Sequence, residues 1–248
     1  IDVVPGIRIR FTDIGHMLGS ACIEVWLKEG VHEKKIVFSG DIGNLNQPIV
    51  KDPSFVEEAD YIVIESTYGT RYHQVVEFDY ATELAHVIQR TFDRGGNVVI
   101  PSFAIGRTQE ILYFLREVKE KDLVPQYRDF EVYVDSPMAI EAIEVFRENM
   151  LECFDEETMA VVNQGINPIS FPGLKTTLTA AESKQINADI TPKVIIASSG
   201  MCEGGRIRHH LKHNLWRSAC TILFVGYQSM GTLGRAIADG VKEVNIFG

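Results

Sequence analysis

Three residues that commonly take part in metal-dependent chemistry stand beside glycines or small residues in the first third of the chain: His16, Asp41 and Glu65. Each lies just before or at the end of a stretch typical of a strand, so we expect all three at strand ends. Imidazole nitrogen and carboxylate oxygen both suit zinc, and a further carboxylate can orient a ligand or a catalytic histidine. The three therefore predict part of a divalent metal site. Spacing alone leaves open that His16 is a structural residue.

A second group of residues has the composition of a phosphate-binding site. Backbone N–H groups at helix N-termini, serine hydroxyls and arginine guanidinium groups all bind phosphate oxygens. Two serine- and glycine-containing loops directly before predicted helices supply these groups. The candidate contacts to a phosphodiester backbone are Ser102, Arg107, Ser198, Ser199, Gly200, Met201 and Arg206. Each loop by itself is also compatible with ordinary strand-to-helix turn chemistry.

The segment 206–217 contains four basic residues and no acidic one, a local charge of +4. Ile207, Leu211 and Leu215 recur every four residues, which predicts a helix with one face in the core. The basic face is either simply solvated or a wall of phosphate contacts, and the sequence leaves both readings open.

Two other features have both a functional and an ordinary interpretation. His209 and His213 are four residues apart, as zinc ligands on a helix can be, but no third ligand accompanies them. Phe103, Tyr68 and Tyr227 fall in loops at strand ends, where aromatic rings could stack on the bases of a single strand. Taken singly, each ring is typical of packing.

The elements that must position these residues change in character along the chain. The first third reads as strands at 21–27, 36–38 and 61–64, with a polar turn at 28–35. From about residue 75, helices and strands alternate. We expect helices at 78–94, 107–119, 139–149 and 206–215, and strands at 97–100, 131–134, 193–197 and 221–225. This alternation predicts a parallel α/β sheet, whose ligands bind at the carboxyl ends of the strands.

The composition limits the classes of protein to which the chain can belong. It has 248 residues, 45% of them hydrophobic, and a formal net charge of −10. Disorder, a polybasic coat protein and a membrane span are excluded, the last because no apolar run approaches roughly 20 residues. The acidity is local, since nine acidic residues and one arginine lie within 131–157. The four cysteines form no CxxC pair, which indicates reduced thiols in a cytoplasmic protein.

Six segments, in order along the chain, closely resemble motifs of the β-CASP branch of the metallo-β-lactamase fold, a family of RNA- and DNA-processing nucleases. They are GHMLGSA at 15–21, FSGDIG at 38–43, IESTYG at 64–69, PSFAIGR at 101–107, VDSPMA at 134–139 and SSGM at 198–201. The resemblance covers essentially the whole chain. It implies an α/β fold with part of a metallo-β-lactamase αββα sheet at 1–74, a Rossmann-like parallel-sheet β-CASP domain at 75–228 and a return segment at 229–248.

The resemblance also implies an activity: hydrolysis of phosphodiester bonds in single-stranded RNA by a cytoplasmic, zinc-dependent ribonuclease. In such a site two zinc ions hold the attacking hydroxide and stabilise the developing negative charge. By match to the motifs, His16 would be a zinc ligand and Asp41 would bridge the two ions and act in catalysis. Glu65 would orient a catalytic histidine, and the serine, glycine and arginine loops would hold the RNA.

The chain also departs from the pattern of the family. None of its seven histidines lies in the expected HxHxDH motif, and the two C-terminal histidine motifs are absent. Both ends fall next to strand-like patterns. We therefore expect an internal fragment of a longer nuclease, one that by itself binds zinc weakly and does not hydrolyse RNA. An incomplete first sheet would leave an exposed edge, which favours a homodimer.

Two other classes of protein could account for parts of this sequence. A non-catalytic RNA-binding or scaffold subunit of the β-CASP type would have lost metal ligands, whereas His16, Asp41 and Glu65 are all present. A Rossmann-like enzyme for small molecules, such as a nucleotide-sugar transferase, would carry a GxGxxG motif after its first strand, and the sequence has none.

Overall fold

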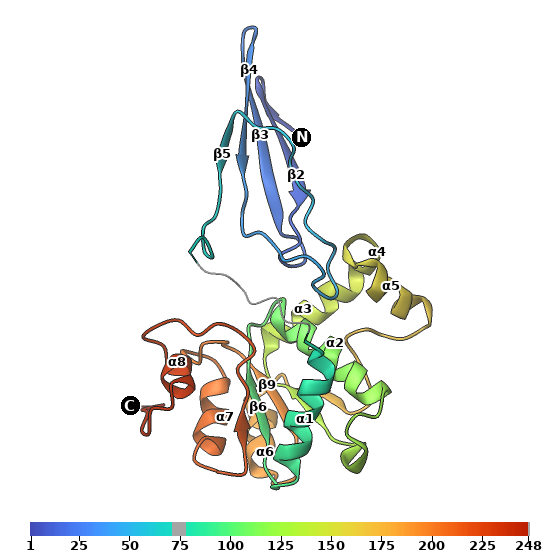
Figure 1. Ribbon diagram of the computed structural model, residues 1–248, viewed down its shortest axis with the longest axis vertical. Coiled ribbons are helices and arrows are strands. Elements are labelled where there is room, and N and C mark those ends of the chain that lie inside the picture. The colour runs from blue at the N-terminus through green and yellow to red at the C-terminus, as the bar shows by residue number, and fades with distance from the viewer. Residues whose placement is uncertain (71–77, 248) are drawn as a thin grey trace. The chain divides into compact units, whose positions relative to one another are not determined.

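The computed structural model describes residues 1–70 and 78–247 (Figure 1). It contains two five-stranded sheets, a mainly antiparallel one early in the chain and a parallel one later. Helices accompany the parallel sheet. The predicted α/β class is therefore confirmed.

The chain divides into two compact units. One is formed by Ile1–Glu77 with Asn149–Gly165, and the other by Phe78–Glu148 with Ile166–Gly248. The predicted domain boundaries at 74 and 228 follow the layout of the family rather than this division, and they stay a prediction.

The sheet of the first unit has its strands in the order of the chain. They are β1 (Asp2–Val4), β2 (Ile7–Asp13), β3 (Ala21–Glu29), β4 (His32–Phe38) and β5 (Tyr61–Val63). All neighbours are antiparallel except β4 and β5, which are parallel. Consequently β2, β4 and β5 all end at the same edge of the sheet. His16, Asp41 and Glu65 follow these three strand ends.

The hairpin between β3 and β4 corrects the predicted polar turn at 28–35, which was wrong in extent. Pairing continues through Lys28↔Glu33 to Glu29↔His32, so the turn is only two residues long. Its first residue, Gly30, has φ 59°, the left-handed conformation that two-residue hairpin loops favour. The charged residues of this segment stand on exposed strands, which is why composition alone suggested a loop.

The two faces of the first sheet differ in burial. A cross-strand row on one face is exposed; its members are Phe11, Ile23, Phe38 and Val63. On the other face Cys22 and Val37 are buried and pack with Ile14 in a small core. Along each strand, residues therefore point to the two faces in alternation, as expected. The face that carries the aliphatic side chains is the one exposed to solvent.

The sheet of the second unit is parallel throughout, in the order β10-β6-β9-β7-β8. Its strands are β6 (Val98–Pro101), β7 (Val132–Val134), β8 (Leu174–Thr176), β9 (Val194–Ala197) and β10 (Thr221–Ile222). β6 and β9 are buried along their whole length, as central strands of a parallel sheet covered on both faces should be.

Eight α-helices and one short 3-10 helix lie in the described residues. They are α1 (Tyr80–Phe92), α2 (Arg107–Glu120), η1 (Pro125–Tyr127), α3 (Pro137–Glu148), α4 (Met150–Cys153), α5 (Glu156–Asn163), α6 (Ala180–Ala188), α7 (Ile207–Asn214) and α8 (Leu233–Ala238). Side chains of Asp79, Asp155, Thr179 and Thr232 cap the N-termini of α1, α5, α6 and α8. α4 and α5 belong to the first unit.

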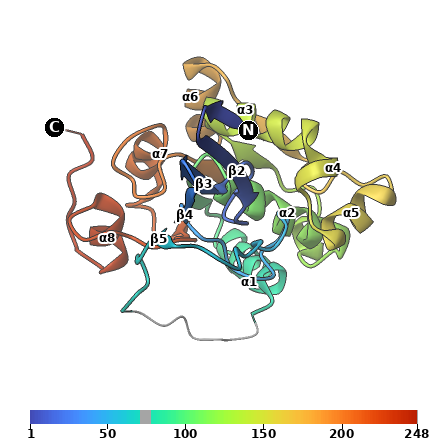
Figure 2. The same cartoon turned by 90° about the horizontal axis from the view of Figure 1, so that it is seen from above.

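Helices cover both faces of the parallel sheet. Val99, Ile195 and Ala197 pack with residues of α6, α7 and α8 on one face. Successive strand residues point to opposite faces, so Val98 and Ile100 point to the side of α1 and α2. Figure 1 shows α7 and α8 on one side of β6 and β9 and α1 and α2 on the other, and Figure 2 again shows α7 and α8 apart from α1 and α2.

The predicted helices and strands are present with shifted ends, and the differences concern short elements. Strand β10 ends at Ile222, three residues earlier than predicted. Four elements between 150 and 188 were missed: α4, α5, β8 and α6. These are at most nine residues long, and a window that short holds too few residues for a clear apolar period.

Two further observations concern the helices and the cysteines. None of the described helices is long and apolar enough to cross a membrane. All four cysteines are free thiols, and Cys22 and Cys202 are buried.

Candidate functional site

Two glycines bring the loops of His16 and Asp41 into direct backbone contact. Gly43 N donates a hydrogen bond to Ile14 O at 2.9 Å. A Cβ on Gly43 would lie only 2.0 Å from the carbonyl oxygen of Gly15, which itself has φ +64°. No other residue type fits at Gly43, so the glycines of both motifs serve to join the two loops.

The first sheet brings together the three residues predicted for metal chemistry. His16 Nε2 lies 4.0 Å from Asp41 Oδ2, and both side chains are partly exposed. Glu65 Oε1 accepts a hydrogen bond of 2.8 Å from the N–H of Ile42, directly after Asp41. This bond, with those from Thr67 and the charge of His16, lowers the pKa of Glu65 although burial opposes the shift. Glu65 is thus held as a carboxylate beside the pair.

The fit of this site to zinc is partial. His16 and Asp41 present a nitrogen and an oxygen that one ion could share. A catalytic zinc ion has three protein ligands and a water. Within residues 1–70 and 78–247, no group of three histidine, cysteine or acidic residues could hold a metal ion. The two residues therefore form half of a coordination sphere.

The carboxyl edge of the parallel sheet gathers the residues predicted to bind phosphate. The loop of residues 198–201, which follows β9, is folded on its own hydrogen bonds. Ser199 N donates to Gly204 O at 3.1 Å, and Gly204 N donates to Ser199 Oγ at 3.3 Å. Ser198 Oγ donates to Ser136 Oγ, which follows β7. Ser198, Ser199 and Met201 are half-buried, and Gly200 is buried.

A buried carboxylate, Asp135, fixes the helix that follows this loop. Its oxygens accept hydrogen bonds from Thr177, Ser183 and Arg206 and lie 2.7 Å from Nε2 of His210. Burial alone would raise the pKa of Asp135, but the four hydrogen bonds, led by that of His210, hold it well below its usual range. Both Asp135 and His210 are fully buried.

Arg206 lies within this network rather than at the open surface. Its Nη1 donates to Asp135 Oδ1 at 2.6 Å and to Thr177 O at 3.0 Å, and its Nη2 donates to Leu178 O at 2.6 Å. The side chain is 22% exposed. These contacts make Arg206 a residue that positions the loop, and a direct contact with RNA stays a prediction.

The loop after β6, the other loop predicted to bind phosphate, is also held by hydrogen bonds and ion pairs of its own residues. Ser102 is buried, donates to Phe103 O and accepts from Thr108 Oγ1. Arg107 is half exposed and paired with Glu110 at 2.5 Å. Phe103 lies against Gly200, because a Cβ there would meet its ring at 2.9 Å. The two loops are therefore in contact.

Gln228 is a further residue of this edge that its sequence context does not predict. Its Nε2 donates to Gly200 O at 3.0 Å and to Gly226 O at 3.2 Å, so it ties the loop after β9 to the loop after β10. Its Oε1 is buried without a hydrogen-bond partner among the described residues. A Cβ on Gly234 would lie 1.9 Å from that oxygen. Nothing in the spacing of Gln228 indicated this role.

His210 and Asn214 were also missed, although spacing could have found them. Both fall on the stripe of Ile207 and Leu211, and all four are buried. Asn214 Oδ1 accepts a hydrogen bond from the amide of buried Asn97. The core face of α7 is therefore partly polar, and its polar members are linked to the strands.

The opposite side of α7 carries the predicted basic face. The ring of Phe247 lies 4.7 Å from that of His209, and Arg208 lies 4.8 Å from the Phe247 centroid. His209 and His213 find no third metal ligand among the described residues. The three predicted stacking residues are about half exposed: Phe103 (51%), Tyr68 (46%) and Tyr227 (47%).

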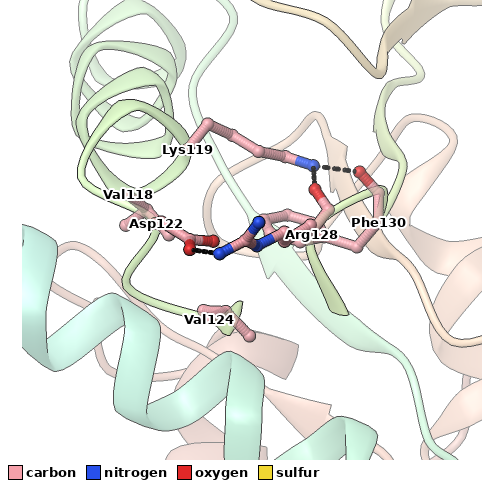
Figure 3. A pocket seen from close by; sticks show the side chains of 6 residues that line it. All are labelled: Val118, Lys119, Asp122, Val124, Arg128 and Phe130. Carbon is pink, nitrogen blue, oxygen red and sulfur yellow. Dashed lines mark hydrogen bonds and ion pairs between the residues drawn. The ribbon is translucent and has the colours of Figure 1, made fainter. Parts of the chain in front are cut away.

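The hollow in Figure 3 lies apart from these residues. It has a volume of about 290 Å³ and is lined by Val118, Lys119, Asp122, Val124, Arg128 and Phe130. Burial lowers the pKa of Lys119 to about 8. Its Nζ donates to the carbonyl oxygens of Arg128 and Phe130, and Arg128 pairs with Asp122 (Figure 3). The polar groups thus satisfy one another.

The two sheets and the residues at their edges define a mixed α/β protein of the metallo-β-lactamase type. A sequence model of the Beta-Casp domain matches residues 108–237, slightly more than half of the 248 residues. The chain belongs to the β-CASP family, and the predicted resemblance is confirmed.

Several curated relatives match almost the whole chain. Ribonuclease TTHA0252 of Thermus thermophilus is 37% identical over 242 residues, which are 98% of this chain and 54% of the relative. An RNase J-like protein of Methanocaldococcus jannaschii is 32% identical, over 99% of this chain and 55% of its own length. Transcription termination factor FttA of Methanosarcina mazei is 32% identical, over 100% of this chain and 38% of its own length. The chain thus spans about half the length of these relatives or less.

Proposed function

We propose that the chain serves in the zinc-dependent hydrolysis of RNA phosphodiester bonds, as part of a β-CASP ribonuclease. The observation that carries this proposal is the gathering of His16, Asp41 and Glu65 at one sheet edge in a chain of this family. The names of two relatives, a ribonuclease and an RNase J-like protein, support the reaction class.

Each residue has a proposed role. His16 and Asp41 would hold metal, through an imidazole nitrogen and a carboxylate oxygen. A bound zinc ion would supply an activated water and a counter-charge for phosphate. Glu65, kept ionised by the Ile42 N–H, orients a histidine. Because the chain supplies only two metal donors, we expect weak zinc binding and no RNA hydrolysis by these 248 residues alone.

The loops after β6 and β9 are the proposed contacts to single-stranded RNA. The groups that could face a phosphate are the partly exposed Arg107 and Ser199. Ser102, Gly200 and Arg206 have their polar groups largely occupied, so we assign them to shaping the loops.

A cytoplasmic location and a homodimer complete the proposal. The first is supported by the free cysteines, and sedimentation velocity would test the second.

Isothermal calorimetry with ZnCl₂ tests the metal assignment. We expect weak binding that disappears in His16→Ala and in Asp41→Asn and is unchanged in His86→Ala, a matched change at an exposed histidine outside the site. Equal binding by all four proteins would reject His16 and Asp41 as ligands. Tight binding of two ions with RNA turnover would reject the incomplete site.

A second candidate function is a non-catalytic RNA-binding subunit of the same family. The partly exposed Arg107 and Ser199 in the loops after β6 and β9 could contact RNA without any metal, which is the observation that favours it. The two candidates differ in one measurement. If zinc binding depends on His16 and Asp41, the metal role stands, whereas RNA binding without any zinc affinity would favour the subunit.

A further inference from the structure

The face of the first sheet opposite the apolar row carries an aromatic ring surrounded by cations. Arg8 of β2, Trp26 of β3 and Lys35 of β4 are direct cross-strand partners. The Arg8 guanidinium lies 4.5 Å from the indole centroid, and Lys35 Nζ lies 5.0 Å from it. Arg10, two residues farther along β2 on the same face, lies 5.5 Å from the indole centroid. We call these four residues the Trp26 patch.

A buried carboxylate holds two of the cations in place. Glu24 is fully buried and accepts from Arg10 Nε at 2.6 Å and from Arg10 Nη2 at 2.7 Å. Lys35 Nζ lies 2.6 Å from Glu24 Oε2, and Thr12 Oγ1 donates to Glu24 Oε1 at 2.6 Å. The hydrogen bonds of Arg10, Lys35 and Thr12 outweigh burial and lower the pKa of Glu24 to about 2. The cations are therefore preorganised at neutral pH.

The patch combines exposed cations with a covered carboxylate. Its three cations face Glu24, and Asp2 of β1 is the cross-strand partner of Arg8, so the cations exceed these two carboxylates by one on a chain of net charge −10. Arg8 is exposed and Arg10 is 60% exposed, while Glu24 is covered. A ligand approaching this face would meet the guanidinium groups and the indole before the acid.

We propose that the Trp26 patch binds single-stranded RNA, with a base stacked at Trp26 and phosphates paired with Arg8 and Arg10. Aromatic rings flanked by arginines are the recurring means of holding single strands without base specificity. An acidic peptide would satisfy the charges but would leave the indole without a stacking partner. The inference rests on the proposed function, which makes RNA the substrate.

The patch is placed to lead a strand toward the proposed metal residues. Arg10 is three residues before the end of β2, after which the loop of His16 begins. At about 3.3 Å per residue, Arg10 is roughly 10 Å from that edge. Trp26 is two cross-strand pairs farther from the same edge. RNA on the patch would therefore extend along β2 toward His16 and Asp41, all within one unit.

The two tryptophans of the chain allow a direct test. Trp216 lies in the basic segment 206–217, and the other tryptophan is Trp26. Trp216→Phe leaves Trp26 as the only indole reporter, and Trp26→Phe leaves only Trp216. Titration with oligouridylate should quench the fluorescence of Trp216→Phe and change that of Trp26→Phe little. Quenching confined to Trp216 would overturn the proposal and place RNA on α7.

Affinity measurements complete the test. Fluorescence anisotropy with labelled oligouridylate should show Trp26→Ala weakening binding by roughly 5- to 100-fold, the range of a lost base stack. Arg8→Ala, which breaks no ion pair with Glu24, should lower the slope of log affinity against log salt by about 0.7. Arg90→Ala, at the exposed end of α1, is the matched control and should change neither quantity.

The outcomes separate this inference from the proposed function. RNA binding that is unchanged in Trp26→Ala and Arg8→Ala would reject the patch and leave the function standing. Absence of RNA binding in every form would reject the function itself. If polyglutamate bound with the same loss in Arg8→Ala and oligouridylate did not bind, the patch would belong to an acidic protein partner. Thermal melts of each variant confirm that it is folded.

Discussion

Among the residues that the structure describes, two carboxylates are fully buried, Glu24 and Asp135, and both are surrounded by cations and hydroxyls. A buried charge is stable only when it is paired and hydrogen-bonded, and removing one partner leaves the others uncompensated. Glu24 organises a surface for a strand of RNA, and Asp135 fixes the loop and helix after β9. At the residue scale, the chemistry of both sites depends on these two acids.

Asp135→Asn should destabilise the second unit strongly. The amide removes the negative charge that Arg206 and His210 face in the core, and such losses cost about 3–5 kcal/mol. Urea unfolding followed by circular dichroism measures the difference. Asp122→Asn, at a surface ion pair, should cost less than about 1 kcal/mol. Equal effects of the two changes would contradict the role of Asp135.

Glu24 predicts a specific pH dependence of stability. Its folded pKa of about 2 lies below its ordinary value of 4.5, so its contribution is present above pH 4.5 and is lost as the pH falls toward 2. In Glu24→Gln that contribution is absent at every pH. The difference in unfolding free energy between wild type and Glu24→Gln should therefore shrink from pH 5 to pH 2. A difference that is constant over this range would show that Glu24 is not held by its cations.

At the element scale, the sequence predicted the elements that have a clear apolar pattern. α1, α2 and α7 were found because their apolar residues recur with the helical period, and β6, β7 and β9 because each is a short apolar run between loops. α4, α5 and α6 were missed because they are short, and β8 because only one of its three residues is apolar. The β3–β4 hairpin was misjudged because exposed strands are as polar as turns. Strand ends placed His16, Asp41 and Glu65 together, and the stripe of Ile207 and Leu211 could have shown that His210 is buried. Gln228, in contrast, depends on tertiary contacts that spacing does not encode.

Gly43→Ala tests how the two metal loops are joined. The new methyl group would lie 2.0 Å from Gly15 O, so the loops must separate. We expect a loss of about 1–3 kcal/mol, as in other overpacked sites, and loss of His16-dependent zinc binding. Calorimetry and thermal melting measure the two effects. Gly226→Ala, where a Cβ meets nothing within 4 Å, is the control and should change neither.

Gly234→Ala tests the link made by Gln228. A methyl group 1.9 Å from Gln228 Oε1 would displace the amide that holds the carbonyls of Gly200 and Gly226. We expect weaker RNA binding through the loop after β9, with a stability loss of about 1–3 kcal/mol. Gly204→Ala, in the same region with open space around it, should leave both unchanged. If the two variants behaved alike, the Gln228 link would be irrelevant to binding.

At the scale of the whole molecule, each compact unit carries one set of functional residues. The antiparallel unit holds His16, Asp41 and the Trp26 patch, and the parallel unit holds the serine- and glycine-rich loops. The exposed apolar row on the first sheet is a surface that water does not favour, and it is the part of the molecule most suited to contact another polypeptide. The net charge of −10 excludes only a polybasic protein that coats nucleic acid through its overall charge. The basic residues proposed to contact RNA are concentrated locally.

The central claim is that this β-CASP chain binds single-stranded RNA as a nuclease component. Fluorescence anisotropy of labelled oligouridylate, titrated with the 248-residue chain at several salt concentrations, tests it most directly. The account predicts saturable binding that weakens as salt increases, because phosphate contacts release counterions. Arg8→Ala and Gly234→Ala should each weaken that binding, and their matched controls should not. An affinity for RNA that is undetectable even at low salt would contradict the account.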